Sequence, residues 1–350
     1  MNKNPYNLIF GKEPIQTISR TAQSSEILMS FQEEPPSQQI YMITGIRGCG
    51  KTVFMTEIAK ELGKNDEWVV VELNSSQDLL TDLAASLGSE DNLAKIFKNA
   101  SINLSFFGIG LEVKESVPIS NLQVALTKML ESLKKHGKKV LVCIDEVTVT
   151  DPMKAFAGAF QIFIRQDLPI YLLMTGLYEN INNLQNEENL TFLYRAPKIE
   201  LKPLNLGNVA ENYKKNFKLN DETANKMSAL TKGYSFAFQV LGYFTWKNNG
   251  DYKKAIPDFR SYLEDYVYEK VWDEMSQGDR RFVYGIAKSK DGKAKNIKEI
   301  LSIENNEYSV YRNRLVKRGI INGNEHGYVR LTLPLFDEFA IRKIDFENID

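Results

Sequence analysis

One short run of residues in the sequence has the types and the spacing needed to bind phosphate groups. Residues 45–52 read GIRGCGKT and fill every fixed position of the pattern G-x-x-x-x-G-K-[ST]. The glycines let the backbone curve closely, so that its N–H groups point at phosphate oxygens, while Lys51 supplies a charge to the β and γ phosphates. The run therefore predicts a site for ATP or ADP. The contact residues expected there are Gly45, Ile46, Arg47, Gly48, Cys49, Gly50, Lys51, Thr52 and Val53.

A metal-binding carboxylate is expected close to these phosphates, and the segment KKVLVCIDE at 138–146 supplies one. Its apolar residues predict a buried strand. Asp145 follows them, where an acid would be costly inside a sheet but suits its carboxyl edge. Asp145 and the Thr52 hydroxyl are the predicted ligands of Mg²⁺, and Glu146 is placed to polarise a water for attack on the γ-phosphate. The alternative is a pair of solvated acids that end a strand.

Two more side chains at the borders of predicted strands are candidates for catalysis. Thr175 ends the apolar run LPIYLLMTG, where its hydroxyl would reach the γ-phosphate or the attacking water. It could equally be a threonine that only ends the strand. Arg195 precedes the run PKIELKPL, where its charge would meet the γ-phosphate of a neighbouring subunit. A contact within the same chain and an ordinary surface salt bridge are the alternatives for Arg195.

The elements that must position these residues alternate between strands and helices. Apolar, β-branched runs predict buried strands at 39–44, 67–73, 138–146, 168–176 and 197–204. Helical patterns lie between them, for example at 78–88 and 122–135. Continuous apolar strands that alternate with helices predict an α/β fold, with a parallel sheet covered on both faces. Residues 101–118 break the pattern and predict a small hairpin or a flap.

The C-terminal half of the sequence changes character. Helical patterns at 208–217, 221–231, 236–247 and 259–275 predict a small helical domain. From Ser276 onward, three helical patterns precede two short strand-like segments, GIINGN and YVRLTLP, which is the order of a winged helix. The expected organisation is a P-loop nucleotide-binding domain at 1–206, a helical lid domain at 207–275 and a winged-helix domain at 276–350.

The composition fits a chain of about two to three domains. The 350 residues are 43% hydrophobic and 25% charged, and no apolar run approaches the roughly 18 residues of a membrane span. The first residues lack the apolar core of a secretory signal, and two cysteines suit a reducing compartment, so a cytoplasmic location is expected. The two histidines, His136 and His326, are far apart, which leaves little basis for a zinc site.

The motifs resemble those of AAA ATPases of the archaeal-ATPase and STAND type, which are relatives of the origin-recognition initiator ATPases. GIRGCGKT, VLVCIDE, LLMTG and the arginine before IELKPL carry the resemblance, which covers roughly residues 10–345. Phe10 and Gly11 belong to FGKE, which is similar to the F-x-G-R-E box that packs against adenine in that group. The stretch TKGYSFAFQVLGYF resembles the family's G-x-P stretch near the base and ribose, with Ser235 at the usual proline position. The resemblance implies the strand order of that ATPase class, a Mg·ATP ligand and frequent oligomerisation.

Charge is distributed unevenly along the chain. The net charge of −1 gives no reason to expect nucleic acid, but the stretch from Arg280 to Arg318 alone carries a net +7. In the helix predicted at 306–319, an inward stripe is expected from Val310, Tyr311 and Leu315. The side chains expected to face double-stranded DNA are Ser309, Arg312, Asn313, Arg314, Lys317 and Arg318. DNA is therefore a candidate partner through 280–318, and a packing or protein-contact role is the alternative.

The predicted function combines these features. The chain is expected to bind ATP and to be either a Mg²⁺-dependent ATPase, with Glu146 as the base, or a nucleotide switch that turns over slowly. Its winged helix would couple it to DNA or to a protein partner, and a homo-oligomer is a further candidate assembly. The alternative is a DNA-binding regulator in which the nucleotide is structural and is not turned over. A turnover assay with and without double-stranded DNA separates these possibilities.

Overall fold

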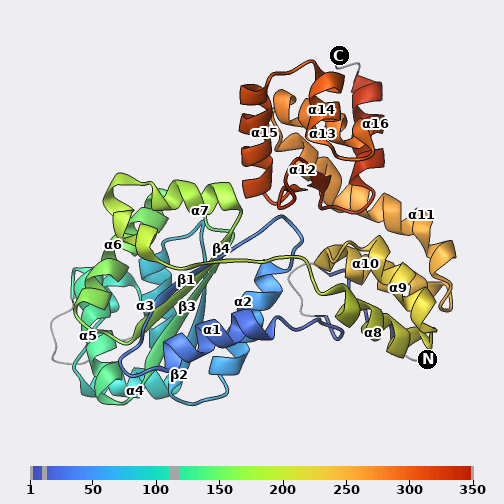
Figure 1. Ribbon diagram of the computed structural model, residues 1–350. Coiled ribbons are helices and arrows are strands. Elements are labelled where there is room, and N and C mark those ends of the chain that lie inside the picture. The colour runs from blue at the N-terminus through green and yellow to red at the C-terminus, as the bar shows by residue number, and fades with distance from the viewer. Residues whose placement is uncertain (1–2, 10–13, 110–118, 348–350) are drawn as a thin grey trace. The chain divides into compact units, whose positions relative to one another are not determined.

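The computed structural model describes residues 3–9, 14–109 and 119–347 of the chain. Contacts between residues divide it into two compact units (Figure 1). The first, called here the α/β unit, comprises Arg20–Thr44 and Lys51–Glu200. The second, called the helical unit, comprises Met1–Ser19, Gly45–Gly50 and Leu201–Asp350. The glycine-rich part of the phosphate motif therefore clusters with the C-terminal half of the chain.

The α/β unit is built on a five-stranded parallel sheet. Its strands are β1 Ile40–Thr44, β2 Trp68–Asn74, β3 Lys139–Asp145, β4 Ile170–Gly176 and β5 Lys198–Glu200. They lie in the order β2-β3-β4-β1-β5. Thr44 of β1 pairs with Gly176 of β4, and Ile144 of β3 pairs with Met174. The carboxyl ends of these three strands are therefore level, with the end of β4 between the other two.

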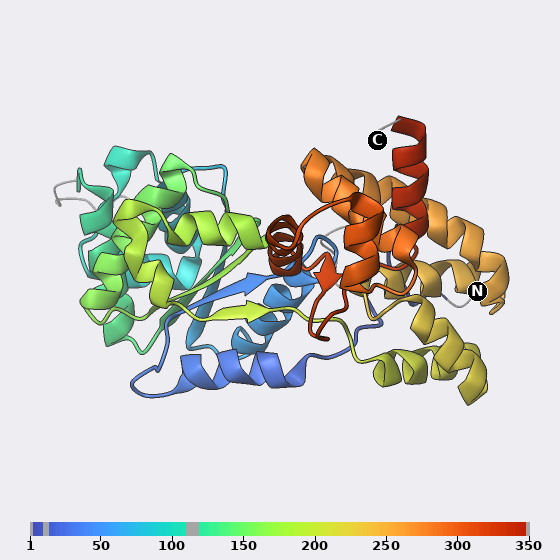
Figure 2. The ribbon, with the colours of Figure 1, turned by 45° about the horizontal axis from the view of Figure 1, so that its top comes forward.

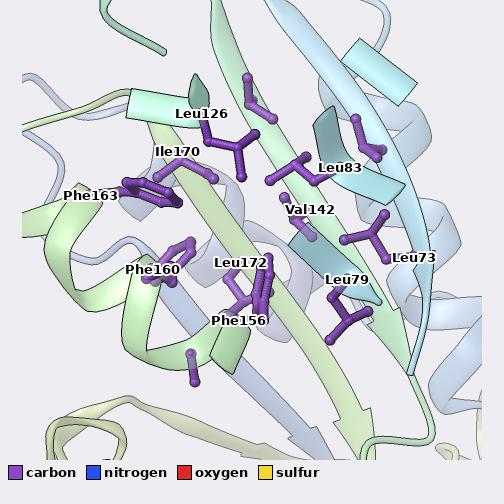
Figure 3. Packing of buried hydrophobic residues seen from close by; sticks show 14 of the residues in the cluster. Leu73, Leu79, Leu83, Leu126, Val142, Phe156, Phe160, Phe163, Ile170 and Leu172 are labelled. Atoms are coloured by element: carbon purple, nitrogen blue, oxygen red, sulfur yellow. The ribbon is translucent and has the colours of Figure 1, made fainter. Parts of the chain in front are cut away.

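Helices cover both faces of this sheet (Figures 1 and 2). They are α1 Thr21–Gln32, α2 Lys51–Leu62, α3 Leu79–Ser89, α4 Asp91–Asn99, α5 Leu122–Lys135, α6 Asp151–Arg165 and α7 Tyr178–Gln185, with the 3-10 turns η1 Ser105–Phe107 and η2 Glu188–Arg195. On the face of α1 and α2, the Phe31 ring lies 5.6 Å from Tyr41 and 5.1 Å from Tyr171, centroid to centroid. On the other face, α3, α5 and α6 bury Leu83, Leu126 and Phe160 against the sheet (Figure 3).

Local signals in the sequence set where these helices begin. The Asp78 carboxylate accepts hydrogen bonds from two backbone N–H groups in the first turn of α3, and Asn121 accepts one in α5. Thr150 caps α6 in the same way, directly before an Asp-Pro pair that suits a first helical turn. Every residue of β4 is buried, as expected for a central parallel strand with helices on both faces.

The helical unit begins with helices that correspond to the predicted lid. They are α8 Leu206–Phe217, α9 Asp221–Leu230, α10 Ser235–Lys247, α11 Tyr252–Leu263, the π-helical turn η3 Glu264–Tyr268 and α12 Glu269–Asp273. The N-terminal segment packs among them, because Tyr6 is only 2% exposed and stacks on Phe217. The Tyr6 hydroxyl donates a hydrogen bond to Asn212 at 2.9 Å. A Cβ on Gly242 would lie 2.4 Å from the Tyr6 ring, so this close approach requires glycine.

The last part of the helical unit contains helices and one strand pair. Its elements are α13 Gln277–Ser289, α14 Ala294–Leu301, α15 Asn305–Lys317, β6 Ile321–Asn322, β7 Arg330–Leu331 and α16 Phe336–Glu347. The two strands are antiparallel, and an isolated bridge joins Lys293 to Tyr328. Helix α16, which the sequence pattern did not predict, packs against α13. Within the described ranges, every helix is too short or too polar to cross a bilayer.

The structure confirms the predicted fold class, a P-loop-type parallel sheet with helices on both faces, followed by a helical C-terminal region. The inward stripe predicted for α15 is wrong at Val310, which is 59% exposed, because the positions that this helix buries are Tyr308 and Leu315. Of the segment 101–118, residues 101–109 contain a 3-10 turn where a hairpin or flap was predicted, and residues 110–118 lie outside the described residues.

Candidate nucleotide site

The loop between β1 and α2 carries the phosphate motif and needs glycine at two of its positions. Gly48 and Gly50 have φ angles of 75° and 94°, in the left-handed region where a side chain is strained. A Cβ on Gly48 would also lie 2.1 Å from the Tyr234 hydroxyl. The Cys49 N–H donates to the Ile46 carbonyl at 3.2 Å and closes a turn. The glycines of the motif therefore stand where the backbone conformation requires them.

The last residues of the motif open a helix. Lys51 is the first residue of α2 and is 9% exposed, and Thr52 and Val53 are half-buried in the first turn. The first N–H groups of a helix have no partner within it and carry a partial positive charge. Together with the Lys51 ammonium group, this helix end suits the oxygens of an anionic ligand.

Asp145, the last residue of β3, accepts hydrogen bonds from two threonines. The Thr52 hydroxyl donates to Asp145 Oδ2 at 2.7 Å, and the Thr175 hydroxyl donates to Asp145 Oδ1. Thr175 is fully buried on β4, the strand inserted between β1 and β3. The structure therefore brings together Thr52, Asp145 and Thr175, which are more than a hundred residues apart at the extremes of the sequence.

Glu146 follows with an unusual backbone conformation. Its φ angle is 50°, in the left-handed region that non-glycine residues adopt at a cost of about 1 kcal/mol. Its N–H donates to Asp145 Oδ1 at 3.1 Å and to the Thr175 hydroxyl oxygen at 3.2 Å, which holds the conformation in place. The Glu146 side chain is exposed.

The chemistry of these side chains fits a magnesium ion that is bound partly by a substrate. Mg²⁺ in proteins usually takes one or two protein oxygens and completes its shell with phosphate and water. The Thr52 hydroxyl and the Asp145 carboxylate supply such oxygens within 2.7 Å of each other. In the described part of the chain, no group of three or more His, Cys, Asp or Glu gathers into a metal site of its own.

Cys143, two residues before Asp145, is not a reactive group. It is 1% exposed, and burial, with a smaller effect of the nearby Glu72 charge, raises the pKa of its thiol to about 12. The thiol therefore stays protonated at neutral pH and acts as a small apolar side chain of the sheet core.

Arg195 is not brought together with these residues within the chain. It is an exposed residue at the end of η2, three residues before the amino end of β5, where Lys198 pairs with Met42. Asp145 and Thr175 lie at the carboxyl ends of their strands, which in a parallel sheet is the opposite edge. This position disfavours a contact in the same chain, whereas the contact with a neighbouring subunit stays a prediction.

The two remaining predicted site residues, Phe10 and Gly11, lie outside the described residues. The flanking residues are described and belong to the helical unit. Tyr6 packs against α8 and α10, and Gln16 accepts a hydrogen bond from Asn212 at 2.7 Å. The contact of Phe10 and Gly11 with a base therefore stays a prediction.

Three arginines predicted to face DNA are engaged inside the helical unit. Arg314 donates to the buried Asp279 carboxylate from Nε at 2.8 Å and from Nη2 at 2.6 Å. Arg318 donates to the Glu274 carbonyl at 3.2 Å, and Arg312 donates to another backbone carbonyl at 2.5 Å. The prediction that Arg314 faces a DNA groove is therefore wrong, because its guanidinium group neutralises a buried acid.

The sequence analysis did not predict that the side chains of Tyr234 and Glu274 contact the phosphate motif. The Tyr234 hydroxyl donates to the Arg47 carbonyl at 2.7 Å. The Glu274 carboxylate binds the Arg47 guanidinium at 3.1 Å. The Arg47 side chain is therefore directed to an acid of the helical unit. The stretch around Tyr234 was singled out for its resemblance to a base-contacting motif, but no local pattern pointed to its contact with the loop.

Two protein-family models match parts of the sequence, and solved structures match the fold. Residues 20–192 match a family described as an ATPase domain predominantly from Archaea, and residues 265–340 match a domain of unknown function (DUF8462). The structure resembles a Walker-type ATPase of Pyrococcus abyssi, with 16% identity, 93% of this chain and 96% of that chain covered, and a TM-score of 0.66. It also resembles the Aeropyrum pernix ORC2 protein in its ADPNP and ADP complexes, with 12% identity, 97% and 96% covered, and a TM-score of 0.62. No curated protein sequence matches the chain.

These findings define the class of the protein. Residues 20–192 are a P-loop ATPase domain of the archaeal type, with the fold seen in Walker-type and ORC ATPases. The acid that ends β3 lies at the carboxyl edge of the parallel sheet, the edge at which open α/β folds bind ligands, and it accepts a hydrogen bond from the last residue of the phosphate motif. The chain is thus a nucleotide-binding protein of the ATPase class.

Proposed function

We propose that the chain binds Mg·ATP at residues 45–52 and hydrolyses it to ADP and phosphate, either as an ATPase or as a slow nucleotide switch. The observation that carries this proposal is the hydrogen bond of 2.7 Å between the Thr52 hydroxyl and Asp145. It joins the end of the phosphate motif to a carboxylate at the carboxyl edge of the sheet. Magnesium, when bound there, would neutralise charge on the β and γ phosphates.

Each side chain of the site then has a separate task. Lys51 holds the β and γ phosphates, and Thr52 and Asp145 hold the metal. Glu146 accepts a proton from the attacking water as that water adds to the γ-phosphate in line with the leaving oxygen. Thr175 fixes the orientation of the Asp145 carboxylate and of the Glu146 backbone through the two bonds that it makes.

Two substitutions test binding and chemistry separately. At a free ATP concentration of about 100 times Kd, the wild-type protein gains about 2.7 kcal/mol of stability, and Lys51→Ala is expected to lose this gain in a melting experiment with Mg·ATP. Glu146→Gln is expected to keep the gain and to lower the rate of phosphate release at least ~100-fold. Equal melting shifts for wild type and Lys51→Ala would show that the phosphate site is misassigned.

The controls for this test are Lys135→Ala and Glu131→Gln, which change exposed residues of α5. Both should behave as wild type. A Glu146→Gln protein that turns over at the wild-type rate would remove Glu146 from the mechanism. Wild-type protein that retains ADP through purification and releases phosphate slowly would identify a switch, and rapid multiple turnover would identify an ATPase.

A second candidate function is binding of the DNA backbone by a winged-helix domain at 276–350. Three helices followed by an antiparallel strand pair support this interpretation of the fold. Exposed lysines support the contact with phosphates, and these are Lys288, Lys290, Lys293, Lys295 and Lys317. Because the neighbouring arginines are engaged internally, the proposal is a backbone contact with little reading of sequence.

A salt titration of the full chain with mixed-sequence duplex DNA tests this second candidate. The slope of log K against log salt is about −0.9 for each phosphate neutralised, so changing Lys290, Lys293 and Lys317 together to alanine should flatten it by up to about 2.7. Lys226→Ala, at an exposed position of α9, should leave the slope unchanged. Absence of binding at ~50 mM salt would assign this region to packing or to a protein contact.

A further inference from the structure

The phosphate loop is held from one side by three consecutive residues of the helical unit. The Tyr234 hydroxyl donates to the Arg47 carbonyl at 2.7 Å, and the Ser235 hydroxyl donates to the Cys49 carbonyl at 2.8 Å. The Gly48 carbonyl, which lies between these two in the loop, accepts a hydrogen bond from the Phe236 N–H at 3.1 Å. Three successive carbonyls of the loop, those of residues 47, 48 and 49, are therefore fixed by one short segment at the start of α10.

Fixing a carbonyl also fixes the N–H group on the other side of the same peptide. In a planar trans peptide, the C=O and N–H bonds point in opposite directions. With the Arg47 and Cys49 carbonyls directed at residues 234 and 235, the N–H groups of Gly48 and Gly50 are directed to the opposite side of the loop. Inward N–H groups are the means by which such a loop binds phosphate oxygens.

Tyr234 is well suited to hold the loop. It is 5% exposed, and burial raises the pKa of its hydroxyl well above the usual value, so the hydroxyl stays protonated and acts as a donor. Its oxygen fills the space beside Gly48, where a Cβ would lie 2.1 Å away. Phe236 donates from the first turn of α10, whose N–H groups have no partner within the helix.

A second contact ties the same loop to the C-terminal part of the helical unit. The Arg47 guanidinium binds Glu274 at 3.1 Å, and the carbonyl of Glu274 accepts a hydrogen bond from Arg318 at 3.2 Å. Two residues before Tyr234 in the chain, the Lys232 ammonium group donates to the carbonyls of Leu331 and Leu333 at 3.2 and 3.1 Å. The segment that holds the loop is thus itself held by the strand pair and its flanking residues.

We propose that Tyr234 and Ser235 are positioning residues, which orient the peptide groups of the phosphate loop so that its N–H groups face the phosphates of a bound nucleotide. This inference rests on the proposed function, because it assumes that the loop binds a nucleotide. The start of α10 resembles a stretch that contacts the base, and the inference gives it a different task, which is to orient the phosphate loop. Neither side chain touches the phosphates in this role.

The test compares matched substitutions in the full chain. Tyr234→Phe and Ser235→Ala each remove one hydroxyl that donates to the loop. Tyr213→Phe and Ser228→Ala remove hydroxyls that donate to other carbonyls, those of Phe238 and Leu206, at 2.8 and 2.7 Å. The probe is the fluorescent nucleotide N-methylanthraniloyl-ADP, and the readouts are its Kd, its dissociation rate, and the KM and kcat for ATP.

Each loop variant is expected to raise the Kd and the dissociation rate about threefold to tenfold, and the double variant about tenfold to fiftyfold. KM should rise while kcat stays close to wild type, because the loop binds the phosphates in the ground state and in the transition state alike. The two control variants should bind the probe as the wild type does, even where they lower the melting temperature by a similar amount. A merely structural role would give the same result for both pairs.

Lys51→Ala separates failure of this inference from failure of the proposed function. If Lys51→Ala loses the probe while Tyr234→Phe and Ser235→Ala bind it with the wild-type Kd, the positioning role is overturned and the nucleotide site stands. If Lys51→Ala also binds the probe with the wild-type Kd, the nucleotide site itself is misassigned and the inference falls with it. Should Tyr234→Phe fold poorly, Ser235→Ala alone decides between these outcomes.

Discussion

At the scale of single residues, the Asp145 carboxylate organises the candidate site through the two threonines that donate to it. Thr52 comes from the start of α2 and is a proposed metal ligand. Thr175 comes from β4 and also accepts a hydrogen bond from the Glu146 N–H at 3.2 Å. Its hydroxyl therefore joins Asp145 to Glu146, the proposed base. Its buried hydroxyl is therefore better placed to orient these two residues than a simple strand-ending threonine would be.

Thr175→Val is predicted to lower kcat about tenfold, because it removes a hydrogen bond to a charged group, worth roughly 1.5–3 kcal/mol, with little change in volume. ATP binding measured by the melting shift should persist, since Lys51 and Thr52 are untouched. Thr245→Val is the matched control, because Thr245 is equally buried and its hydroxyl has no hydrogen-bond partner among the described residues. An equal loss of kcat in both variants would mean that packing, and not the hydroxyl of Thr175, is responsible.

At the scale of elements, a buried acid joins α13 to α15. Asp279 is 1% exposed in the first turn of α13, where Ser276 donates to its Oδ2 at 2.8 Å. Arg314 from α15 binds its Oδ1 at 2.6 Å, and Arg318 lies 3.9 Å from its Oδ2. The basic character of α15 thus serves, in part, to neutralise a carboxylate that folding removes from water.

Asp279→Ala is predicted to lower the free energy of unfolding by about 3 kcal/mol, the lower end of the range for breaking a buried ion pair, since Arg314 is still 39% exposed. Urea denaturation followed by circular dichroism measures this change. Glu299→Ala, which breaks the exposed pair with Lys295, should change stability by less than about 0.5 kcal/mol. Equal midpoints for the two variants would contradict the structural role of the Asp279 pair.

For the assembly of the whole molecule, the position of Arg195 disfavours a catalytic contact within one chain, which leaves a contact with a neighbouring subunit and an ordinary surface salt bridge as the alternatives. It precedes the amino end of β5, whereas Asp145 and Thr175 lie at the carboxyl ends of their strands. An arginine supplied by a neighbour stabilises charge on the transferred phosphoryl group and accelerates such reactions by roughly 10³–10⁵.

Arg195→Ala is therefore predicted to keep ATP binding and to lose turnover, and specific activity should rise with protein concentration in the wild type. Mixing Arg195→Ala with Glu146→Gln protein should restore part of the activity, because each can supply the group that the other lacks. Arg165→Ala, which changes an exposed arginine at the end of α6, is the control. An active wild-type protein that sediments as a monomer at all concentrations would exclude the role in trans.

The features of the protein that depend on local spacing could be predicted from the order of the residues. The phosphate motif, the apolar strands and the acid after β3 are contiguous patterns, and each is fixed by the chemistry of one turn, strand or helix end. The parallel orientation of the strands followed from their alternation with helices. The prediction that Val310 faces inward failed because a helix with many polar residues gives a weak periodic signal, and its tertiary contacts then decide which positions are buried.

Contacts between residues that are far apart in the chain could be found only in the folded structure. Tyr234 reaches Arg47 across 187 positions of the chain, and Thr175 reaches Asp145 across 30. The same holds for Arg314, whose role was decided by Asp279, 35 residues away. No short pattern encodes such pairs, because a hydrogen bond between elements depends on how their apolar faces pack, and that packing is a property of the whole core.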